Sequence, residues 1–241
     1  MTTGPESSGT PRESSSHQPT GGPLQAGASV PDEIDPRTPL FFLSYAHAGE
    51  GLRRPSDRNA WFADFFDELS ENVGQLIGRR TGSDPGYMDQ SIPDGDHWTD
   101  RLLQAVGTCQ VFVALLSEPY ITSPWCGMEW HAFSQRTVIP RPGGADGQTA
   151  IIPVIWAPFD RNGAPRAVRA VQWFSPDGLP NITAEYRQHG IFGLMRMESP
   201  ASHQAIWRLA LAISGILRSC WVAPHVFNRN ELRDIFREER C

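Results

Sequence analysis

Apolar residues along the chain follow two patterns that are typical of different elements. Between residues 60 and 78 they recur three and four positions apart, which predicts an amphipathic helix that ends at Gly78. Similar spacing predicts helices over about 97–106 and 202–219. A further helix is expected over 124–133, where Ser123 followed by Pro124 is a usual helix start.

Short runs of consecutive apolar residues lie between these helices. The run at 40–45 is apolar, rich in aromatic residues and of strand length. The runs at 111–116 and 151–156 show no alternation, as expected for strands covered on both faces of a parallel sheet. A shorter strand is predicted at 86–89 and a weak fifth one at 191–197. Alternating strands and helices predict a three-layer, flavodoxin-like α/β domain with a central parallel sheet of about five strands.

The segments outside this pattern divide the chain. Residues 1–37 are rich in Gly, Pro, Ser and Thr and are predicted to be a disordered leader, because they bury too little apolar surface to offset their ordering entropy. The domain is expected over 38–222, and the tail 223–241 is predicted to hold a short charged helix. Pro- and Gly-rich stretches at 137–150 and 157–185 predict long surface excursions.

Composition excludes several classes of function. The formal net charge is −6 and the basic residues include no lysine, which excludes Schiff-base catalysis and a P-loop lysine. No long arginine cluster is present, which argues against nucleic-acid binding. The four widely spaced cysteines form no CxxC pair, so no metal site is assigned. Neither a signal peptide nor a membrane span is indicated, and we expect a cytoplasmic protein.

The expected topology brings three polar segments together. Ligands of an open parallel sheet collect at the carboxyl ends of its strands, near the point where the strand order reverses. The segments that follow the first three strands are Ser44 to His47, Asp89 to Trp98, and Ser117 to Glu129. A candidate site is therefore expected where they meet.

Three sequence motifs carry a resemblance to a known family. FFLSYAH at 41–47 resembles the first signature box of TIR domains. GYMDQSIPDGDHW at 86–98 resembles their second strand and following loop, and VALLSEPYITSPWCGMEW at 113–130 resembles the third strand through the WxxxE helix. The order and spacing agree over about 39–133, and the closest subtype is the bacterial TIR-like FxsC type.

The resemblance implies either cleavage of the nicotinamide–ribose bond of NAD+ or homotypic assembly in signalling, and it leaves open whether the chain is an enzyme. In the enzymes of the family, the glutamate of WxxxE is catalytic, which corresponds to Glu129, and Trp125 lies one turn before it. The aromatic residue that stacks on nicotinamide corresponds to Trp98. NAD+ would be a substrate, with no bound cofactor. Self-association is implied through the loop Gln90 to His97, and the FxsC type implies partners encoded in a peptide-maturation gene cluster.

The chemistry of this reaction is compatible with a single carboxylate. Breaking the bond builds positive charge on the ribose, which Glu129 could stabilise, and nicotinamide leaves as a neutral molecule without an acid to protonate it. A tryptophan face such as that of Trp98 attracts the pyridinium ring.

Structural roles compete with each of these assignments. Glu129 could be a solvated carboxylate in the second turn of its helix, and Trp98 or Trp125 could serve packing. Asp89 could hydrogen-bond its own loop. A phospho-receiver of the same fold class is disfavoured, because the first strand ends without an acidic pair and no lysine is available.

The segment after the first strand offers ligand contacts of a simpler kind. Ser44 and Tyr45 could reach a ligand from the end of the strand, and His47 is proposed as a phosphate contact.

Overall fold

The computed structural model describes residue 1 and residues 38–46, 60–78, 84–89, 100–144 and 147–238. The predicted leader lies outside these residues apart from Met1. So do His47, Trp98 and the loop Gln90 to His97, on which predictions were made.

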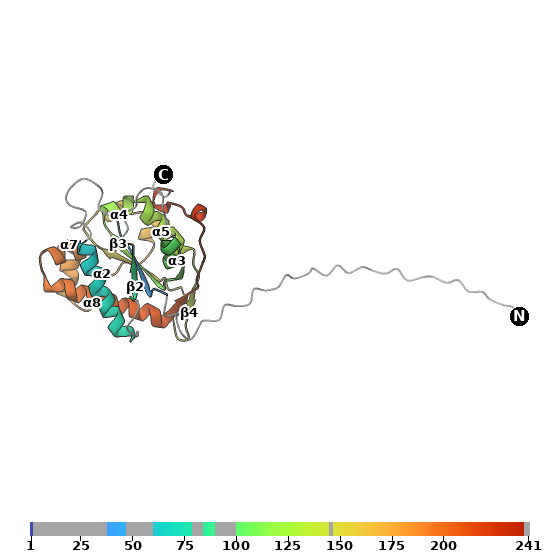
Figure 1. The fold of residues 1–241 in the computed structure, drawn as a ribbon, viewed down its shortest axis with the longest axis horizontal. Coiled ribbons are helices and arrows are strands. Elements are labelled where there is room, and N and C mark those ends of the chain that lie inside the picture. The colour runs from blue at the N-terminus through green and yellow to red at the C-terminus, as the bar shows by residue number, and fades with distance from the viewer. Residues whose placement is uncertain (2–37, 47–59, 79–83, 90–99, 145–146, 239–241) are drawn as a thin grey trace.

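A parallel sheet of four strands forms the centre of the described structure (Figure 1). Its strands are β1 (Phe41–Ser44), β2 (Gly86–Met88), β3 (Val111–Leu116) and β5 (Ile151–Ile155). Their order is β2-β1-β3-β5, and the register pairs Phe41 with Gly86 on one side and with Val111 on the other. All residues of β3 and β5 are buried, because helices cover both faces of the sheet. The fold class and the four main predicted strands are confirmed.

The predicted fifth strand at 191–197 is wrong. These residues lie in and just after α7 (Pro180–Arg196), where the buried Ile191 and Leu194 are three positions apart, a helical spacing. The helix is kinked at Gly190, which has φ +65°. A Cβ at this position would lie 2.5 Å from the carbonyl oxygen of Trp156, so only glycine fits where α7 crosses the end of β5.

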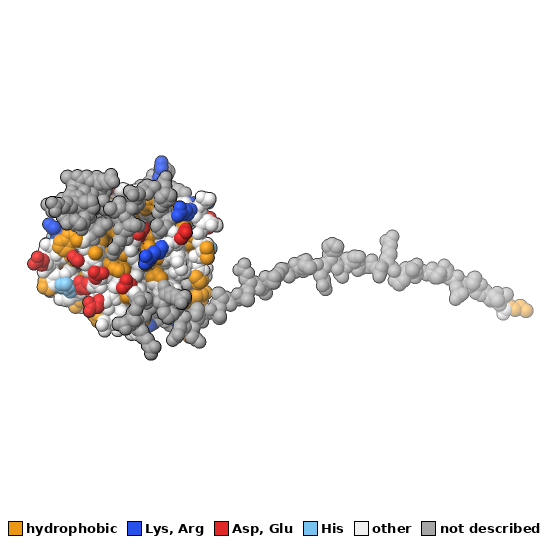
Figure 2. All heavy atoms as spheres, viewed as in Figure 1, with side chains coloured by type: hydrophobic (Ala, Val, Ile, Leu, Met, Phe, Trp, Pro, Cys, Tyr) orange, Lys and Arg blue, Asp and Glu red, His pale blue; other side chains and the backbone are white. Residues whose placement is uncertain are grey.

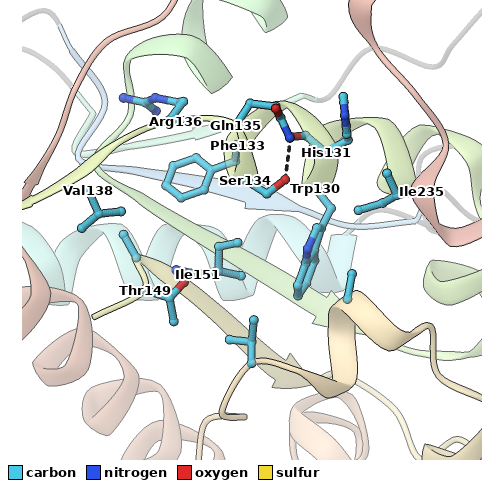
Figure 3. A pocket seen from close by; sticks show the side chains of 13 residues that line it. Trp130, His131, Phe133, Ser134, Gln135, Arg136, Val138, Thr149, Ile151 and Ile235 are labelled. Atoms are coloured by element: carbon cyan, nitrogen blue, oxygen red, sulfur yellow. Dashed lines mark hydrogen bonds between the residues drawn. The ribbon is translucent and has the colours of Figure 1, made fainter. Parts of the chain in front are cut away.

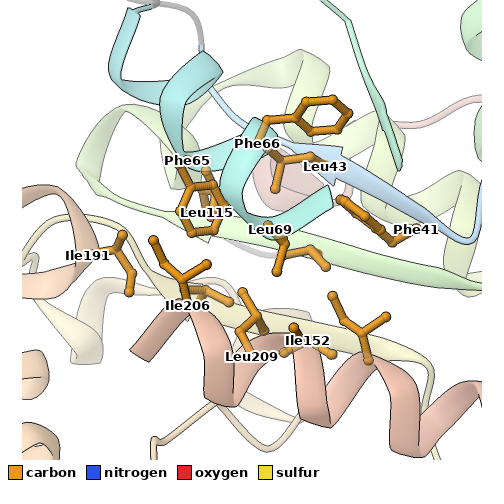
Figure 4. Close-up of a cluster of buried hydrophobic side chains, with 14 of the residues drawn as sticks. Phe41, Leu43, Phe65, Phe66, Leu69, Leu115, Ile152, Ile191, Ile206 and Leu209 are labelled. Carbon is orange, nitrogen blue, oxygen red and sulfur yellow. The ribbon is translucent and has the colours of Figure 1, made fainter. Parts of the chain in front are cut away.

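Helices α2 (Ala60–Ile77), α7 and α8 (Pro200–Ser219) cover one face of the sheet (Figure 1). Figure 4 shows their core, in which Phe65 and Leu69 of α2 meet Ile206 and Leu209 of α8 over the strands. The predicted helical face of α2 is confirmed over most of its length, and Gly78 ends the helix in the left-handed conformation with φ +66°.

A second set of helices covers the opposite face of the sheet. They are α3 (Asp100–Thr108), α4 (Glu118–Thr122), α5 (Pro124–Ser134), α6 (Arg166–Arg169) and α9 (Ile235–Glu238), with two short 3-10 helices at Arg161–Gly163 and Arg229–Glu231. Their buried side chains meet Phe42, Phe112 and Leu116 from the sheet. The two cores give the three layers that the sequence predicts.

The predicted surface excursions contain regular structure. The first one holds β4 (Val138–Pro140), which pairs antiparallel with β6 (Cys220–Val222) in a separate two-stranded sheet. The second one holds α6 and the first residues of α7, and its Ala164 and Val168 are buried in the second core. The single apolar residues of these segments pack against helices that are distant in the sequence, and local pattern does not reveal such contacts.

Acidic side chains gather on the surface formed by α2 (Figure 2). Asp64, Asp67 and Glu71 are exposed, and Glu68 lies 2.9 Å from the imidazole Nδ1 of His203 on α8. No helix in the described part of the chain is long and apolar enough to cross a membrane.

Candidate active site at the end of strands β1 and β3

The candidate site lies where the strand order reverses. The chain passes from β1 to β2 on one side and to β3 on the other, so the carboxyl ends of β1 and β3 mark the switch point of the sheet. Ser44 is the last residue of β1, and α4 and α5 directly follow β3. The topology therefore places Ser44 opposite the side chains of α4 and α5.

Two serine caps start the helices that follow β3. The Ser117 side chain accepts a hydrogen bond from the backbone N–H of Tyr120, and the Ser123 side chain accepts one from Cys126. Pro124 occupies the first turn of α5, where its missing N–H has no cost. The predicted start of this helix is confirmed, and it directs Glu129 toward β1.

Three side chains form a hydrogen-bonded group at this point. The Ser44 hydroxyl donates a short hydrogen bond to Oε2 of Glu129 and lies 2.9 Å from the hydroxyl of Tyr120. Ser44 is 1% exposed and Tyr120 is fully buried, whereas Glu129 keeps part of its surface accessible. The carboxyl group of Glu129 is thus held by the buried hydroxyl group of Ser44, which in turn contacts the buried hydroxyl group of Tyr120.

The ionisation of Glu129 is strongly perturbed. Burial of the carboxyl group raises the pKa of Glu129 to about 8, the Ser44 hydrogen bond lowers this pKa, and the nearby charge of Asp89 raises it. A solvated helix carboxylate would show no such effect. The side chain is therefore better described as a partly buried acid at a switch point than as a surface charge.

Tyr45 and Asp89 are joined through the backbone. The Tyr45 hydroxyl donates a hydrogen bond of 2.6 Å to the carbonyl oxygen of Asp89, which ties the end of β1 to the end of β2. The Tyr45 ring packs against Phe62 with a centroid distance of 4.4 Å and is 5% exposed. Burial also raises the pKa of Tyr45, so its hydroxyl stays protonated.

The predicted site residues are thus only partly brought together. Ser44, Glu129, Tyr45 and Asp89 meet at one end of the sheet, and Trp125 packs at the edge of the second core. The direct contact of Ser44 or Tyr45 with a ligand stays a prediction.

Tyr120 is a site residue that the sequence analysis missed. It lies in the short helix α4, which was not predicted, and it is fully buried although its neighbours Glu118 and Pro119 are exposed. A tyrosine three residues after a serine cap at the end of a buried strand is the signal that could have indicated it.

The far end of α5 is anchored by a buried arginine. The guanidinium group of Arg136 donates hydrogen bonds to the carbonyl oxygens of Val106, Cys109, Val222 and Ala223. It is 6% exposed, and no carboxylate in the described residues lies within ion-pair distance of it. Arg136 therefore joins α5 to the end of α3 and to β6.

The C-terminal segment packs directly on α4 and α5. The ring of Phe236 in α9 lies 5.9 Å from the rings of both Tyr120 and Trp130 and is fully buried. At Gly127 an added Cβ would lie 2.2 Å from Oδ1 of Asp234, so the segment approaches α5 closely only because residue 127 is glycine. The helices that carry Tyr120 and Glu129 are held from outside by this contact.

A separate pocket of about 460 Å³ lies between the end of α5, β5 and α6 (Figure 3). Its lining includes Trp130, Phe133 and Ile151 but neither Ser44 nor Glu129. It is thus distinct from the group at the strand ends.

The described residues contain no group of three His, Cys, Asp or Glu side chains that could hold a metal ion. Cys109, Cys126 and Cys220 are buried free thiols. Burial raises the pKa of the Cys126 thiol, which therefore remains neutral beside Glu129 and is not an activated nucleophile.

Comparison with protein families gives a match over most of the central domain. A family model described as TIR domain matches residues 41–188, which run from β1 into α7 and include Ser44, Asp89, Tyr120 and Glu129. No curated protein and no solved structure matches the chain. The matched range covers more than half of the chain and stops before α8, β6 and α9.

Proposed function

Because the chain belongs to the TIR domain family, we propose that this signalling domain also hydrolyses NAD+ at the nicotinamide–ribose bond, with Glu129 as the catalytic residue. The observation that carries the proposal is the position of Glu129. Its carboxyl group is fixed by Ser44 at the switch point of the sheet and remains partly accessible.

The proposed reaction needs one anionic group and no metal. The C–N bond to nicotinamide breaks, its electron pair leaves with nicotinamide, and the positive charge that develops on the ribose is stabilised by the Glu129 carboxylate. Water then forms the new C–O bond, which gives ADP-ribose and releases one proton. Asp89 lies close enough to raise the pKa of Glu129 and adds negative charge near the developing cation.

The rate should rise with pH. The carboxylate is the active form, and burial holds the pKa of Glu129 at about 8 in the free protein, so most molecules carry the neutral acid at pH 7. We expect kcat/KM to increase about tenfold per pH unit below pH 8 and to level off above it. The positive pyridinium ring of bound NAD+ favours the carboxylate, so kcat should level off at a lower pH. A kcat/KM that is flat between pH 6 and pH 9 would contradict this role of Glu129.

The first experiment is a direct assay of nicotinamide release. The purified full chain is incubated with NAD+ at low and at high protein concentration, because the family resemblance implies assembly of the site from neighbouring copies. Release that is lost when glutamine replaces Glu129 supports the proposal. Equal rates for the wild type and this variant would refute it.

A non-catalytic interaction module is the second candidate function, and one observation favours it. A neutral Glu129 hydrogen-bonded to Ser44 could serve only to join α5 to β1. In that case self-association survives Glu129→Gln but fails when Pro93 or Gly95 in the loop Gln90 to His97 is replaced. Sedimentation of these variants separates the two functions, and assembly that is unchanged in the loop variants would count against the module.

The physiological partners are proposed from the resemblance to the FxsC type. If the chain is of the FxsC type, its partners are proteins of a peptide-maturation gene cluster. Co-purification with the products of neighbouring genes tests this proposal, and a chain that binds none of them would contradict it.

A further inference from the structure

We propose that Ser44 and Tyr120 form a directional hydrogen-bond chain that favours the ionised form of Glu129, and that both act as positioning residues beneath the site. The catalytic meaning of this chain rests on the proposed function. Its effect on the ionisation of Glu129 does not, because it follows from the arrangement of the three side chains.

Counting hydrogens gives the direction of the chain when Glu129 is ionised. A serine hydroxyl has one hydrogen, and Ser44 gives it to Oε2 of Glu129. The contact of 2.9 Å between Ser44 and Tyr120 is therefore a hydrogen bond only if Tyr120 donates. The order Tyr120 to Ser44 to Glu129 uses every hydroxyl hydrogen of the chain and ends on a carboxylate.

A neutral Glu129 fits this chain less well. If Glu129 donates its proton to Ser44, then Ser44 donates to Tyr120, and the Tyr120 hydrogen has no acceptor among the described residues. Tyr120 is fully buried, so a lost hydrogen bond is not replaced by solvent. If the proton instead lies on Oε1, Ser44 bonds a neutral oxygen, which accepts about half as strongly as a carboxylate. Both arrangements disfavour the protonated acid.

Burial and one nearby charge among the described residues act in the opposite direction. Asp89 after β2 is a negative charge and raises the pKa of Glu129, as does burial. Tyr45 after β1, Cys126 on α5 and Tyr120 on α4 are held neutral because burial raises the pKa of each. Among the described residues, the hydrogen bond from Ser44 is thus the main interaction that opposes the burial of this carboxyl group.

The test measures the titration of Glu129 directly. The side-chain carboxyl carbon is followed by 13C NMR from pH 4 to pH 10 in the full chain, with Glu129→Gln used to assign the resonance. Ser44→Ala should raise the pKa of Glu129 by about one unit, because one hydrogen bond to a charged group is lost. Tyr120→Phe should raise it by a smaller amount, because it only weakens the donor of the remaining bond.

Two further variants make the test specific. Asp89→Asn removes a negative charge and should lower the pKa of Glu129. Tyr186→Phe is the matched control, because Tyr186 is also fully buried and its hydroxyl accepts a hydrogen bond of 2.7 Å from the backbone N–H of Ile155, away from Glu129. It should leave the titration of Glu129 unchanged.

The outcomes separate this inference from the proposed function. If the titration of Glu129 is the same in the wild type, Ser44→Ala and Tyr120→Phe, or moves downward in the latter two, the chain does not set the ionisation and the inference is overturned. If the titration moves as expected but no nicotinamide is released, only the proposed enzyme activity fails. If the titration moves as expected and nicotinamide is released, the pH at which kcat/KM levels off should be higher in Ser44→Ala, in agreement with the pKa of Glu129 measured by NMR.

Discussion

Replacing Glu129 by glutamine is expected to lower nicotinamide release at least 100-fold. The same variant is expected to become more stable, relative to the wild type, as the pH increases. Removing one group that stabilises charge in a transition state typically costs about 100-fold to 1,000-fold in rate. Glutamine keeps the size of the side chain and an oxygen that can accept from Ser44, so the loss reports the missing charge.

The stability effect follows from the raised pKa. The folded protein holds the proton of Glu129 up to about pH 8, whereas an unfolded chain releases it near the ordinary value of 4.5. Between these values the folded state binds more protons, so the wild type loses stability as the pH rises through this window. Glutamine does not ionise, so the variant does not lose this stability as the pH rises. Because part of the side chain is accessible, we expect a relative gain of about 2 kcal/mol for Glu129→Gln at pH 9 compared with pH 4.

Urea unfolding of both proteins between pH 4 and pH 9 measures this difference, since effects shared by the two chains cancel. Glu71→Gln removes an exposed carboxylate of α2 and is the control for nicotinamide release, which it should not change. A stability difference between Glu129→Gln and the wild type that does not vary with pH would show that Glu129 ionises as an ordinary glutamate.

Arg136→Met is expected to lower the free energy of unfolding by about 3 to 5 kcal/mol. Methionine keeps most of the apolar stem but removes the donors that bind the carbonyl oxygens of Val106, Cys109, Val222 and Ala223. These acceptors lie around a side chain that is 6% exposed, so water does not readily replace the lost bonds. The contacts that join α5 to α3 and β6 would be lost together.

Thermal and urea unfolding measure this loss, and a domain of this size should unfold roughly 6 to 20 °C lower. Arg136→Lys keeps the charge with fewer donors and should lose less stability. Arg169→Met changes an exposed arginine of α6 in the same way and should unfold within about 0.5 kcal/mol of the wild type. A loss below about 1 kcal/mol in Arg136→Met would contradict the anchoring role of this residue.

The predictions from sequence succeeded where one element carries its own periodic pattern. The apolar face of α2 and the uninterrupted runs of β3 and β5 were readable because each buries its side chains at a regular spacing. The prediction at 191–197 failed because a short apolar run fits a strand or a buried helix equally well. Its conformation was decided by the kink at Gly190 and by the contact of α7 with the end of β5.

The residues of the candidate site also differ in whether the sequence alone could reveal them. Glu129 and Ser44 could be found from motifs and from the rule that ligands collect at strand ends, because Ser44 ends a predicted strand and Glu129 lies in a predicted helix. Arg136 and Phe236 could not, because each is buried by partners that are distant in the sequence. Tyr120 was missed although the serine cap before it is a local signal, and its contact with Ser44 is visible only in the structure.

The sequence by itself determined the order of the four central strands and of the main helices between them, the parallel sheet and the family, since these depend on local spacing and on motifs within single segments. Only the tertiary structure decided the chemical state of Glu129. The pKa of a carboxyl group depends on its burial, its hydrogen bonds and nearby charges, and here those come from β1, the end of β2 and the fold around α5.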